Sequence, residues 1–552
     1  MYYYTFRDFT GIEQHKSGEM LGSGTASMAK GIATQNGQLQ PFKDFSFVYA
    51  IEGKESWYTS WFDVVQDPEY PSFFYIFALI GQSGVLQLYV YHSSYSTWTN
   101  TVLSVPSLGV YSSMLARIGT TDYLLWATTA GIKRVRIPDG TIEDLGSGVS
   151  AYNSTVSSYN SETLTITVAG TLSTEAARRA LVAGVYYGAS DSWAAVASAS
   201  GTSIVLSSAP TTAPAASDVI EITGGIVPSA RFITEYAGRM FAANDDDCPN
   251  RLYWSCVAGD GRTWADWDAV EGSADASGGY TDIGHITDNI TGIFPMPNEL
   301  LIFKMHSLWR LYGDRPSNFT IERICTVNNH AYHNQIVECG GLACWFTRYG
   351  VHCYNGSSVS VLGEGYRKLA EIASDLNLYS DRVRAFAIND VLYFPVVYSS
   401  VAHLLAYDML RDSYMFYSAD RFRNYYEYRG ALFASLYSSE ANLALLNRVL
   451  ANTSVPGAYW TTQLTDFGES YTKKQVKWIA FRAEGTKLIL KLTCDKQVIE
   501  KLITIPADGI VRVSYNAKPC VAMQLTISTT PDNDYWKILG GITVAFEKEA
   551  IS

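Results

Sequence analysis

The chain has 552 residues, more than a single-core domain usually holds, so more than one structural unit is expected. Hydrophobic residues make up 47%, enough for a substantial core, and 38 Tyr and 13 Trp favour half-buried sheet faces and protein interfaces. The formal net charge of −12, without a basic run, argues against sustained DNA binding.

The first segment, residues 1–45, is rich in Gly, Ser and polar residues and ends in an Asn36-Gly37 turn that runs into an extended stretch. We expect a structural arm that closes a β-propeller, its strand completing the blade contributed by the other end of the chain. The N-terminus has neither a basic n-region nor an apolar h-region, and no segment is long enough to span a bilayer. We therefore expect a chain without a membrane segment that is made in the cytoplasm.

Residues 46–145 contain two pairs of alternating apolar runs. Phe73–Phe77 precedes Val85–Tyr91, and Tyr123–Ala127 precedes Gly131–Ile137. Alternation of bulky apolar residues between short polar breaks is the signal of a β-hairpin.

Residues 146–228 change character, because Ser, Thr, Ala and Gly dominate and aromatic residues become rare. Strands are indicated at Thr163–Val168, Ser203–Leu206 and Val219–Ile222, and a short helix at Glu175–Ala183. We interpret this segment as a small domain inserted between repeated modules.

Residues 229–454 repeat one pattern four times: a small polar turn, an alternating apolar run, a second turn and a second run. The four pairs are Gly238–Ala243 with Arg251–Ser255, Leu300–Lys304 with Leu308–Tyr312, Gly341–Phe346 with Gly350–Gly356, and Val391–Phe394 with His403–Asp408. A further apolar run follows at Ala431–Tyr437. The spacing suits four-stranded blades, so we predict an all-β chain containing a β-propeller of about six to eight blades. A stacked array of β-sandwiches is the structural alternative.

Residues 455–552 carry evenly spaced strand signals after an aromatic start at Trp460. The clearest runs are Lys473–Ile479, Lys487–Thr493 and Gly509–Val513. They predict an independent antiparallel β-sandwich at the C-terminus.

Three local features invite a catalytic or metal-binding interpretation. Gly259–Trp264 resembles the Asp-box turn of sialidase-like propellers, but Gly259 stands where that turn has its Asp. The run Asp245-Asp246-Asp247 lacks the alternating ligands and the Gly of an EF-hand loop. We expect neither a catalytic site nor a cofactor.

The third feature is the group Cys339, Cys344, His352 and Cys353, with His330 and His333 nearby. Its spacing is not a paired zinc knuckle, and Cys344 and Cys353 lie inside apolar runs, so we expect core packing and no metal. The eight cysteines, thinly spread, indicate reduced thiols rather than a disulfide framework.

Several short motifs occur in a characteristic order. They are Asn36-Gly37-Gln38-Leu39-Gln40-Pro41, Gly238-Arg239-Met240-Phe241, Asn250-Arg251-Leu252-Tyr253-Trp254-Ser255, Trp264-Ala265-Asp266-Trp267, Leu300–Lys304 with Trp309–Gly313, and Tyr349–Gly356. In this order the chain resembles the virion β-propeller proteins of tailed bacteriophages, the group of tail nozzle and head-to-tail stabilisation proteins. Residues 146–228 depart from that pattern.

The resemblance implies a structural virion protein rather than an enzyme. Copies would form a ring, expected to be hexameric, below the portal or adaptor protein, with other tail proteins and tail fibres as partners. The ring would line the channel through which DNA leaves, without sequence-specific binding. The protein would be assembled in the host bacterial cytoplasm and located in the virion tail.

Acids in the blade loops are the candidate residues for facing the channel or a neighbouring subunit, because a negative wall repels DNA. They are Asp245, Asp246, Asp247, Asp266, Asp268 and Glu271. A glycan-binding propeller of a tail tip and a propeller glycosidase are the alternative functions.

Overall fold

The structure is a computed structural model that describes residues 1–7, 9, 26–35, 37–41, 46–49, 51, 58–82, 85–106, 109–118, 120–145, 152–188, 192–222, 227–257, 264–267, 275–326, 331–347, 349–362, 382–398, 401–418, 422–436, 443–446, 457–467, 469–495 and 497–550. The chain forms two compact units, residues 1–59 with 334–552 and residues 60–333. In the described ranges no helix has the length and apolar character needed to cross a membrane.

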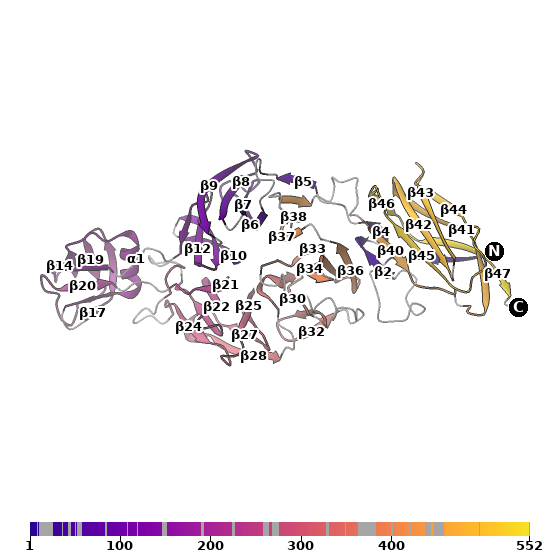
Figure 1. Ribbon diagram of the computed structural model, residues 1–552. Helices are drawn as coiled ribbons and strands as arrows, with labels where there is room; N and C mark the ends of the chain where they lie inside the picture. The colour runs from indigo at the N-terminus through magenta and orange to yellow at the C-terminus, as the bar shows by residue number, and fades with distance from the viewer. Residues whose placement is uncertain are drawn as a thin grey trace. The chain divides into compact units, whose positions relative to one another are not determined.

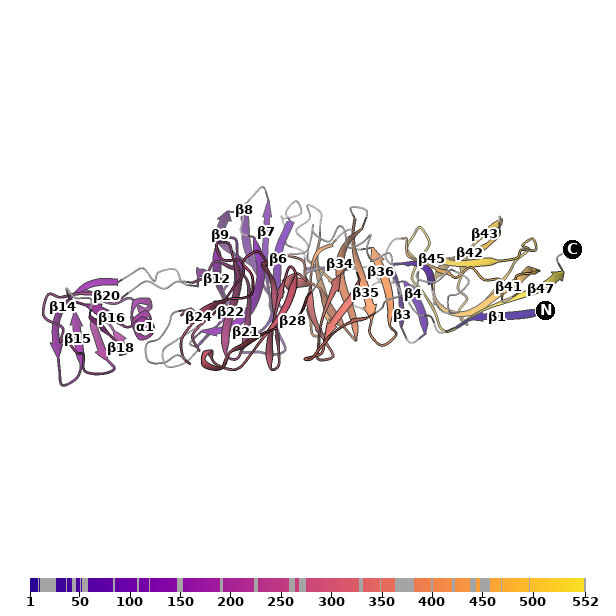
Figure 2. The same cartoon turned by 90° about the horizontal axis from the view of Figure 1, so that it is seen from below.

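Seven four-stranded antiparallel sheets follow one another along the described chain (Figures 1 and 2). Residues 60–333 supply nearly all of four of these sheets. The first sheet contains β6 (Tyr58–Gln66), β7 (Phe74–Gln82), β8 (Val85–His92) and β9 (Thr97–Pro106), and the second contains β10 (Val110–Ile118), β11 (Thr121–Thr128), β12 (Gly131–Arg136) and β13 (Ile142–Asp144). The third contains β21 (Ala230–Tyr236), β22 (Arg239–Asp245), β23 (Arg251–Trp254) and β24 (Gly279–Asp282), and the fourth contains β25 (Ile290–Met296), β26 (Glu299–Lys304), β27 (Ser307–Tyr312) and β28 (Thr320–Thr326). The other unit supplies three: β29 (Ile336–Cys339), β30 (Leu342–Thr347), β31 (Gly350–Tyr354), β32 (Val359–Leu362); β33 (Phe386–Ile388), β34 (Val391–Tyr398), β35 (Val401–Asp408), β36 (Ser413–Ser418); and β37 (Phe422–Tyr428), β38 (Ala431–Leu436), β39 (Leu443–Leu446), β5 (Ser46–Tyr49).

The first strands of consecutive sheets lie beside one another within each unit. In one unit β10 contacts β21 and β21 contacts β25, and in the other β29 contacts β33 and β33 contacts β37. Adjacent first strands are the packing that a β-propeller requires, because each blade places its first strand toward a common axis. The predicted all-β propeller is confirmed, and its seven sheets fall within the expected range.

Apolar side chains between neighbouring blades form the core. Each of the four sequence repeats supplies the second and third strands of a blade, as when Ile302 of β26 pairs with Trp309 of β27. One cluster joins the sheets of β10 and β21 through Leu125, Ile233 and Met240, all fully or almost fully buried. Alternation therefore buries one face of each strand against the next blade.

The inserted segment is a seven-stranded sheet with one helix. Its strands run in the order β17 (Ser192–Ala194), β16 (Val185–Tyr187), β20 (Val219–Ile222), β14 (Tyr152–Asn160), β15 (Thr165–Val168), β19 (Ser203–Leu206) and β18 (Val196–Ser200). The helix α1 (Thr174–Ala183) begins after Ser173, whose hydroxyl accepts a 3.1 Å bond from the Ala176 N–H, and ends at Gly184. The strands and the helix predicted here are confirmed.

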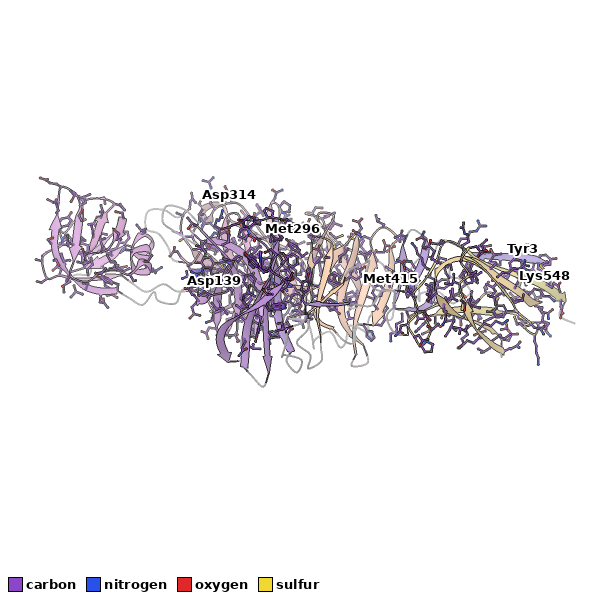
Figure 3. All side chains as sticks on the ribbon, turned by 90° about the horizontal axis from the view of Figure 1, so that it is seen from above. Tyr3, Asp139, Met296, Asp314, Met415 and Lys548 are labelled. Carbon is purple, nitrogen blue, oxygen red and sulfur yellow. The ribbon has the colours of Figure 1, made fainter. Side chains whose placement is uncertain are left out.

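The C-terminal strands form two sheets, which the N-terminal strands complete. One contains β1 (Tyr2–Phe6), β47 (Ile542–Ala550), β41 (Thr472–Gly485), β46 (Trp536–Ile538), β4 (Gln38–Pro41) and β3 (Ile32–Gln35), with β44 (Ile510–Ser514) also paired to β41. The other is β2 (Ala26–Lys30), β40 (Tyr459–Thr462), β45 (Met523–Ser528), β42 (Lys487–Cys494) and β43 (Gln497–Thr504). Tyr3 and Lys548, near the two chain ends, lie close together in Figure 3.

The prediction that residues 1–45 close the propeller is wrong. Their strands join the C-terminal sheets because Phe6, Ile32 and Leu39 are at most 2% exposed in a core shared with those sheets. The strand that completes a blade across the chain is β5, directly after the arm, which pairs with β39. The predicted C-terminal sandwich therefore also includes strands from the first 41 residues.

Candidate functional site

The turns between the first and second strands show which blade differs from the others. In four blades the turn is a residue pair with both φ angles positive: Ala237–Gly238, Gly340–Gly341, Asn389–Asp390 and Arg429–Gly430. Such pairs match the twist of a tight hairpin and leave little surface for binding. The blade of β6–β9 instead carries a longer loop at residues 67–73.

Asp67 organises this loop through both of its carboxylate oxygens. Oδ1 accepts the backbone N–H groups of Glu69 and Tyr70 at 2.8 and 3.1 Å, and Oδ2 lies 2.9 Å from His92 Nε2. His92 Nδ1 in turn lies 2.7 Å from Ser94 Oγ. Burial opposes ionisation of Asp67, but the hydrogen bonds from His92 and from the two N–H groups outweigh it, so the pKa of Asp67 is lowered.

Aromatic rings surround the His92 imidazole. The ring centroids of Tyr75, Tyr95 and Phe73 lie 4.4, 5.1 and 5.8 Å from it. Burial, together with the nearby carboxylates, raises the pKa of Tyr75 to about 12. Because the imidazole is fixed on two sides by hydrogen bonds and packed by rings, the loop and the turn after β8 form one structure.

Other rings of the same loop and turn point to solvent. Tyr95 is 75% exposed, Tyr70 58% and Phe73 36%. We call the following residues the loop-tip cluster: Asp67, Tyr70, Phe73, Tyr75, His92, Ser94 and Tyr95. Large exposed rings on a polar framework are characteristic of a binding surface.

A cavity of about 540 Å³ adjoins the loop, which contributes Pro68 to its wall. The ends of the first strands of three blades line it with Val65, Leu115 and Glu235, among others. Arg117 and Asp122 also line it and form an ion pair at 3.0 Å. The wall thus mixes apolar side chains with polar and charged ones, which can fix the orientation of a ligand.

The Ser94, His92 and Asp67 chain has the connectivity of a hydrolase triad. However, Ser94 lies only two residues after His92 in one exposed turn, and local bonds of this kind are common in turns. The arrangement therefore positions the imidazole and its rings.

The acidic run Asp245–Asp247, a candidate from the sequence, makes hydrogen bonds and an ion pair with nearby residues of the same blade. Asp245 accepts the N–H groups of Ser229 at 3.1 Å and Asp247 at 2.9 Å. Asp246 forms a 2.7 Å ion pair with Arg231. The run is thus largely a capped turn, although Asp246 and Asp247 are exposed.

Asp266, predicted to face the channel or a neighbouring subunit, lies inside the fold of the single chain. Its side chain is buried, at 3% exposure, and its carbonyl oxygen accepts the Cys256 N–H at 2.7 Å. The buried guanidinium of Arg179 in α1 interacts electrostatically with Asp266. Asp268 and Glu271, like most of the segment that resembles an Asp-box, lie outside the described residues.

Three of the segments that carry the sequence resemblance, at Gly238–Phe241, Asn250–Ser255 and Trp264–Trp267, meet in one buried network in the sheet of β21–β24. The Arg239 guanidinium donates to the carbonyl oxygens of Ser255 and Ser277, both at 2.7 Å. Trp264 Nε1 donates to the Gly238 carbonyl at 3.1 Å. Burial lowers the pKa of Arg239, which nonetheless has carbonyl partners in place of a carboxylate. These hydrogen bonds therefore join the start of β22 to the end of β23 and to the long connection before β24.

The cysteine group belongs to the core, as predicted. Cys339, Cys344 and Cys353 are buried, and the sulfurs of Cys344 and Cys353 lie 2.8 Å apart across β30 and β31. Burial lowers the pKa of His352 to about 4, and its ring stacks on Trp345. Among the described residues no group of three or more His, Cys, Asp or Glu side chains could hold a metal ion.

No protein-family model and no curated protein matches the chain. Similar solved structures include an exo-β-1,3-galactanase from Phanerochaete chrysosporium, at 10% identity, 88% coverage of this chain, 95% of that chain and a TM-score of 0.22. A mitotic checkpoint complex matches at 8% identity, 73% and 94% coverage and a TM-score of 0.35, and a glycoside hydrolase at 10% identity, 87% and 97% coverage and a TM-score of 0.23. At these TM-scores the likenesses carry no argument about function.

Proposed function

We propose that the chain is a structural protein of a tailed-phage virion, not an enzyme. Copies form a ring, expected to be hexameric, in the tail nozzle or head-to-tail connector, where they line the DNA exit channel. The ring contacts the portal or adaptor protein, other tail proteins and tail fibres. It is assembled in the bacterial cytoplasm and resides in the virion tail.

The observation that carries this proposal is the buried network around Arg239. The resemblance to the phage group rests on residues separated in sequence, and in the structure Gly238, Arg239 and Trp264 belong to this one network. The meeting of these resembling segments in one blade supports the proposal. The net charge of −12 suits a channel through which DNA slides without being held.

An exposed edge strand supports subunit contacts. Among the described strands β43 pairs with β42 alone, and its side chains alternate between half-buried and exposed. Val498 and Leu502 are 56% and 63% exposed on this edge. An open edge with apolar side chains is a place where another chain can add, and proteins usually cover such edges.

The test is the copy number of this chain, relative to the portal protein, in purified particles from its source. We expect about one copy per two portal subunits, as six-fold and twelve-fold rings on one axis require. Absence of the chain from particles would refute the proposal.

A variant pair examines the edge. Val498→Glu with Leu502→Glu should lower incorporation into particles, because charge on both exposed apolar positions opposes subunit contact. Val219→Glu is the matched control, since Val219 is 59% exposed on β20 of the inserted sheet. Equal incorporation of the two variants would exclude β43 from the subunit contact.

The alternative of a glycan-binding propeller predicts exposed rings in equivalent loops of several blades. The four short turns described above carry no aromatic residue, whereas the loop-tip cluster exposes aromatic rings in one blade. The glycosidase alternative needs two carboxylates facing each other, and the cavity contains Asp122, which is paired with Arg117, and Glu235. A single site in one blade is compatible with a ring subunit.

A further inference from the structure

We propose that the loop-tip cluster, with the adjoining cavity, binds a neutral oligosaccharide. This site is additional to the ring role, which does not depend on it. Three independent features support it: exposed rings on a rigid frame, a cavity of suitable size and a local excess of carboxylates.

The exposed rings provide the stacking surfaces. One face of a pyranose ring presents C–H groups, which pack well on aromatic faces. Tyr70, Phe73 and Tyr95 are all exposed and come from one loop and one turn of the same blade. Contact between exposed aromatic rings and water is unfavourable, so a group of such rings on one surface indicates a binding site.

The frame beneath the rings is already ordered. His92 is hydrogen bonded through both ring nitrogens and contacts the rings of Phe73 and Tyr95. Little side-chain entropy then remains to be lost on binding, and pre-organisation of this kind raises affinity.

The cavity offers room for sugar units beyond the stacked one. Its volume of about 540 Å³ lies within the range of ligand pockets, about 300–1,000 Å³. Pro68 lines it and belongs to the loop that carries Tyr70, so one extended ligand can touch both.

Charge selects a neutral ligand. Exposed carboxylates come from Glu69 in the loop and Glu235 at the cavity, whereas Asp67 is buried and bonded within the loop. The Arg117 guanidinium at the cavity is engaged by Asp122 at 3.0 Å. Carboxylates accept hydrogen bonds from sugar hydroxyl groups, whereas they repel sialylated or sulfated chains.

The experiment applies the full-length protein to a printed array of neutral, sialylated and sulfated oligosaccharides. We expect binding to neutral members only, confirmed by titration calorimetry with the strongest one. The double variant Tyr70→Ala with Tyr95→Ala should weaken that binding at least about tenfold, because two stacking surfaces are lost.

Two controls separate loss of contact from loss of folding. Tyr95→Phe keeps the ring and should retain binding within about threefold, since only one hydrogen-bonding group is removed. Tyr471→Ala removes a ring that is 89% exposed before β41 and should change nothing. Absence of neutral glycan binding, preference for anionic chains, or equal binding by the Tyr70→Ala, Tyr95→Ala variant would overturn the proposal. The copy number in particles is a separate measurement, so failure of one proposal leaves the other to stand or fall alone.

Discussion

Buried charged side chains in the blades are satisfied mainly by neutral partners. Asp63 of β6 accepts hydrogen bonds from Trp61 Nε1 at 2.8 Å, Trp126 Nε1 at 2.7 Å and Ser113 Oγ at 2.8 Å. Lys304 donates to the carbonyl oxygens of Ile283 and His285, and burial lowers its pKa. These residues connect separate strands, so each is a sensitive point for stability.

Substitution of Asp63 should destabilise the contact between the first two blades. Asp63→Asn removes the negative charge that strengthens three hydrogen bonds and turns an amide N–H toward Ser113 Oγ, which must then accept, and we expect a loss of about 1–3 kcal/mol in unfolding free energy. Urea unfolding measures it. The control Asp139→Asn changes an exposed carboxylate paired with Arg136, where about 1 kcal/mol or less is expected. Equal effects of the two substitutions would contradict the proposed role of Asp63.

Acid should loosen the loop-tip cluster through Asp67. The pKa of Asp67 is lowered in the folded state, so its ionised form stabilises the fold above its unfolded pKa of about 4. This contribution is lost as the pH falls through the lower folded value. Protection factors for amide hydrogen exchange, taken relative to the intrinsic rate at each pH, should therefore fall at residues 67–75 and 92–96 below about pH 4. In Asp67→Asn these protection factors should already be lower at pH 7 and should change less with pH, and a variant with the wild-type profile would assign the effect elsewhere.

At the scale of elements, the short turns set the geometry of the blades. Gly340 and Gly341 have φ angles of 59° and 79°, and no heavy atom lies within 4 Å of a Cβ added at either. Gly341→Val should therefore cost about 1–2 kcal/mol through backbone strain alone. Gly341→Asn should cost less, because Asn tolerates this conformation, as Asn389 does in the corresponding turn. Thermal unfolding compares them, and equal costs would mean that side-chain bulk, not φ, decides.

The sequence alone predicted the second and third strands of the blades better than the outer ones. Runs such as Leu300–Lys304 lie between two strands and between blades, so nearly every residue is buried and the pattern is strong. The fourth strand β28 is mostly half-buried or exposed, and its residues carry no clear alternation. A strand is easier to predict when more of its residues are buried, and the outer strands of the blades have few buried residues.

The loop-tip cluster could not be predicted in this way. Asp67 and His92 come from different loops, and exposed Tyr70 and Tyr95 leave no periodic signal. The acidic residues were chosen by charge alone, which does not distinguish an exposed Asp246 from a buried Asp266. A loop longer than its counterparts was the available signal, and it requires the blade boundaries to be known first.

At the scale of the whole molecule, the two chain ends stabilise each other. Tyr4 pairs with Val544 and Phe6 with Ile542, a register that no local pattern in the sequence specifies. The N-terminal arm was therefore assigned to the wrong sheet, although its apolar alternation was visible. Pairing of distant strands depends on which edge is open, and that is a property of the assembled fold.

The pairing of β1 with β47 predicts which part of the chain loses stability when β1 is altered. Phe6 is fully buried in the sandwich core, so Phe6→Ala should cost about 3–5 kcal/mol in that region. Hydrogen exchange should accelerate across residues 459–550, which are more than 450 residues from β1 in sequence, whereas residues 74–145 in the other unit should keep their protection. Tyr3→Ala is the control, because Tyr3 is 63% exposed on the same strand and should have a much smaller effect. Faster exchange in residues 74–145 would mean that β1 stabilises the blades as well, and unchanged exchange in 459–550 would mean that the C-terminal sheets hold without it.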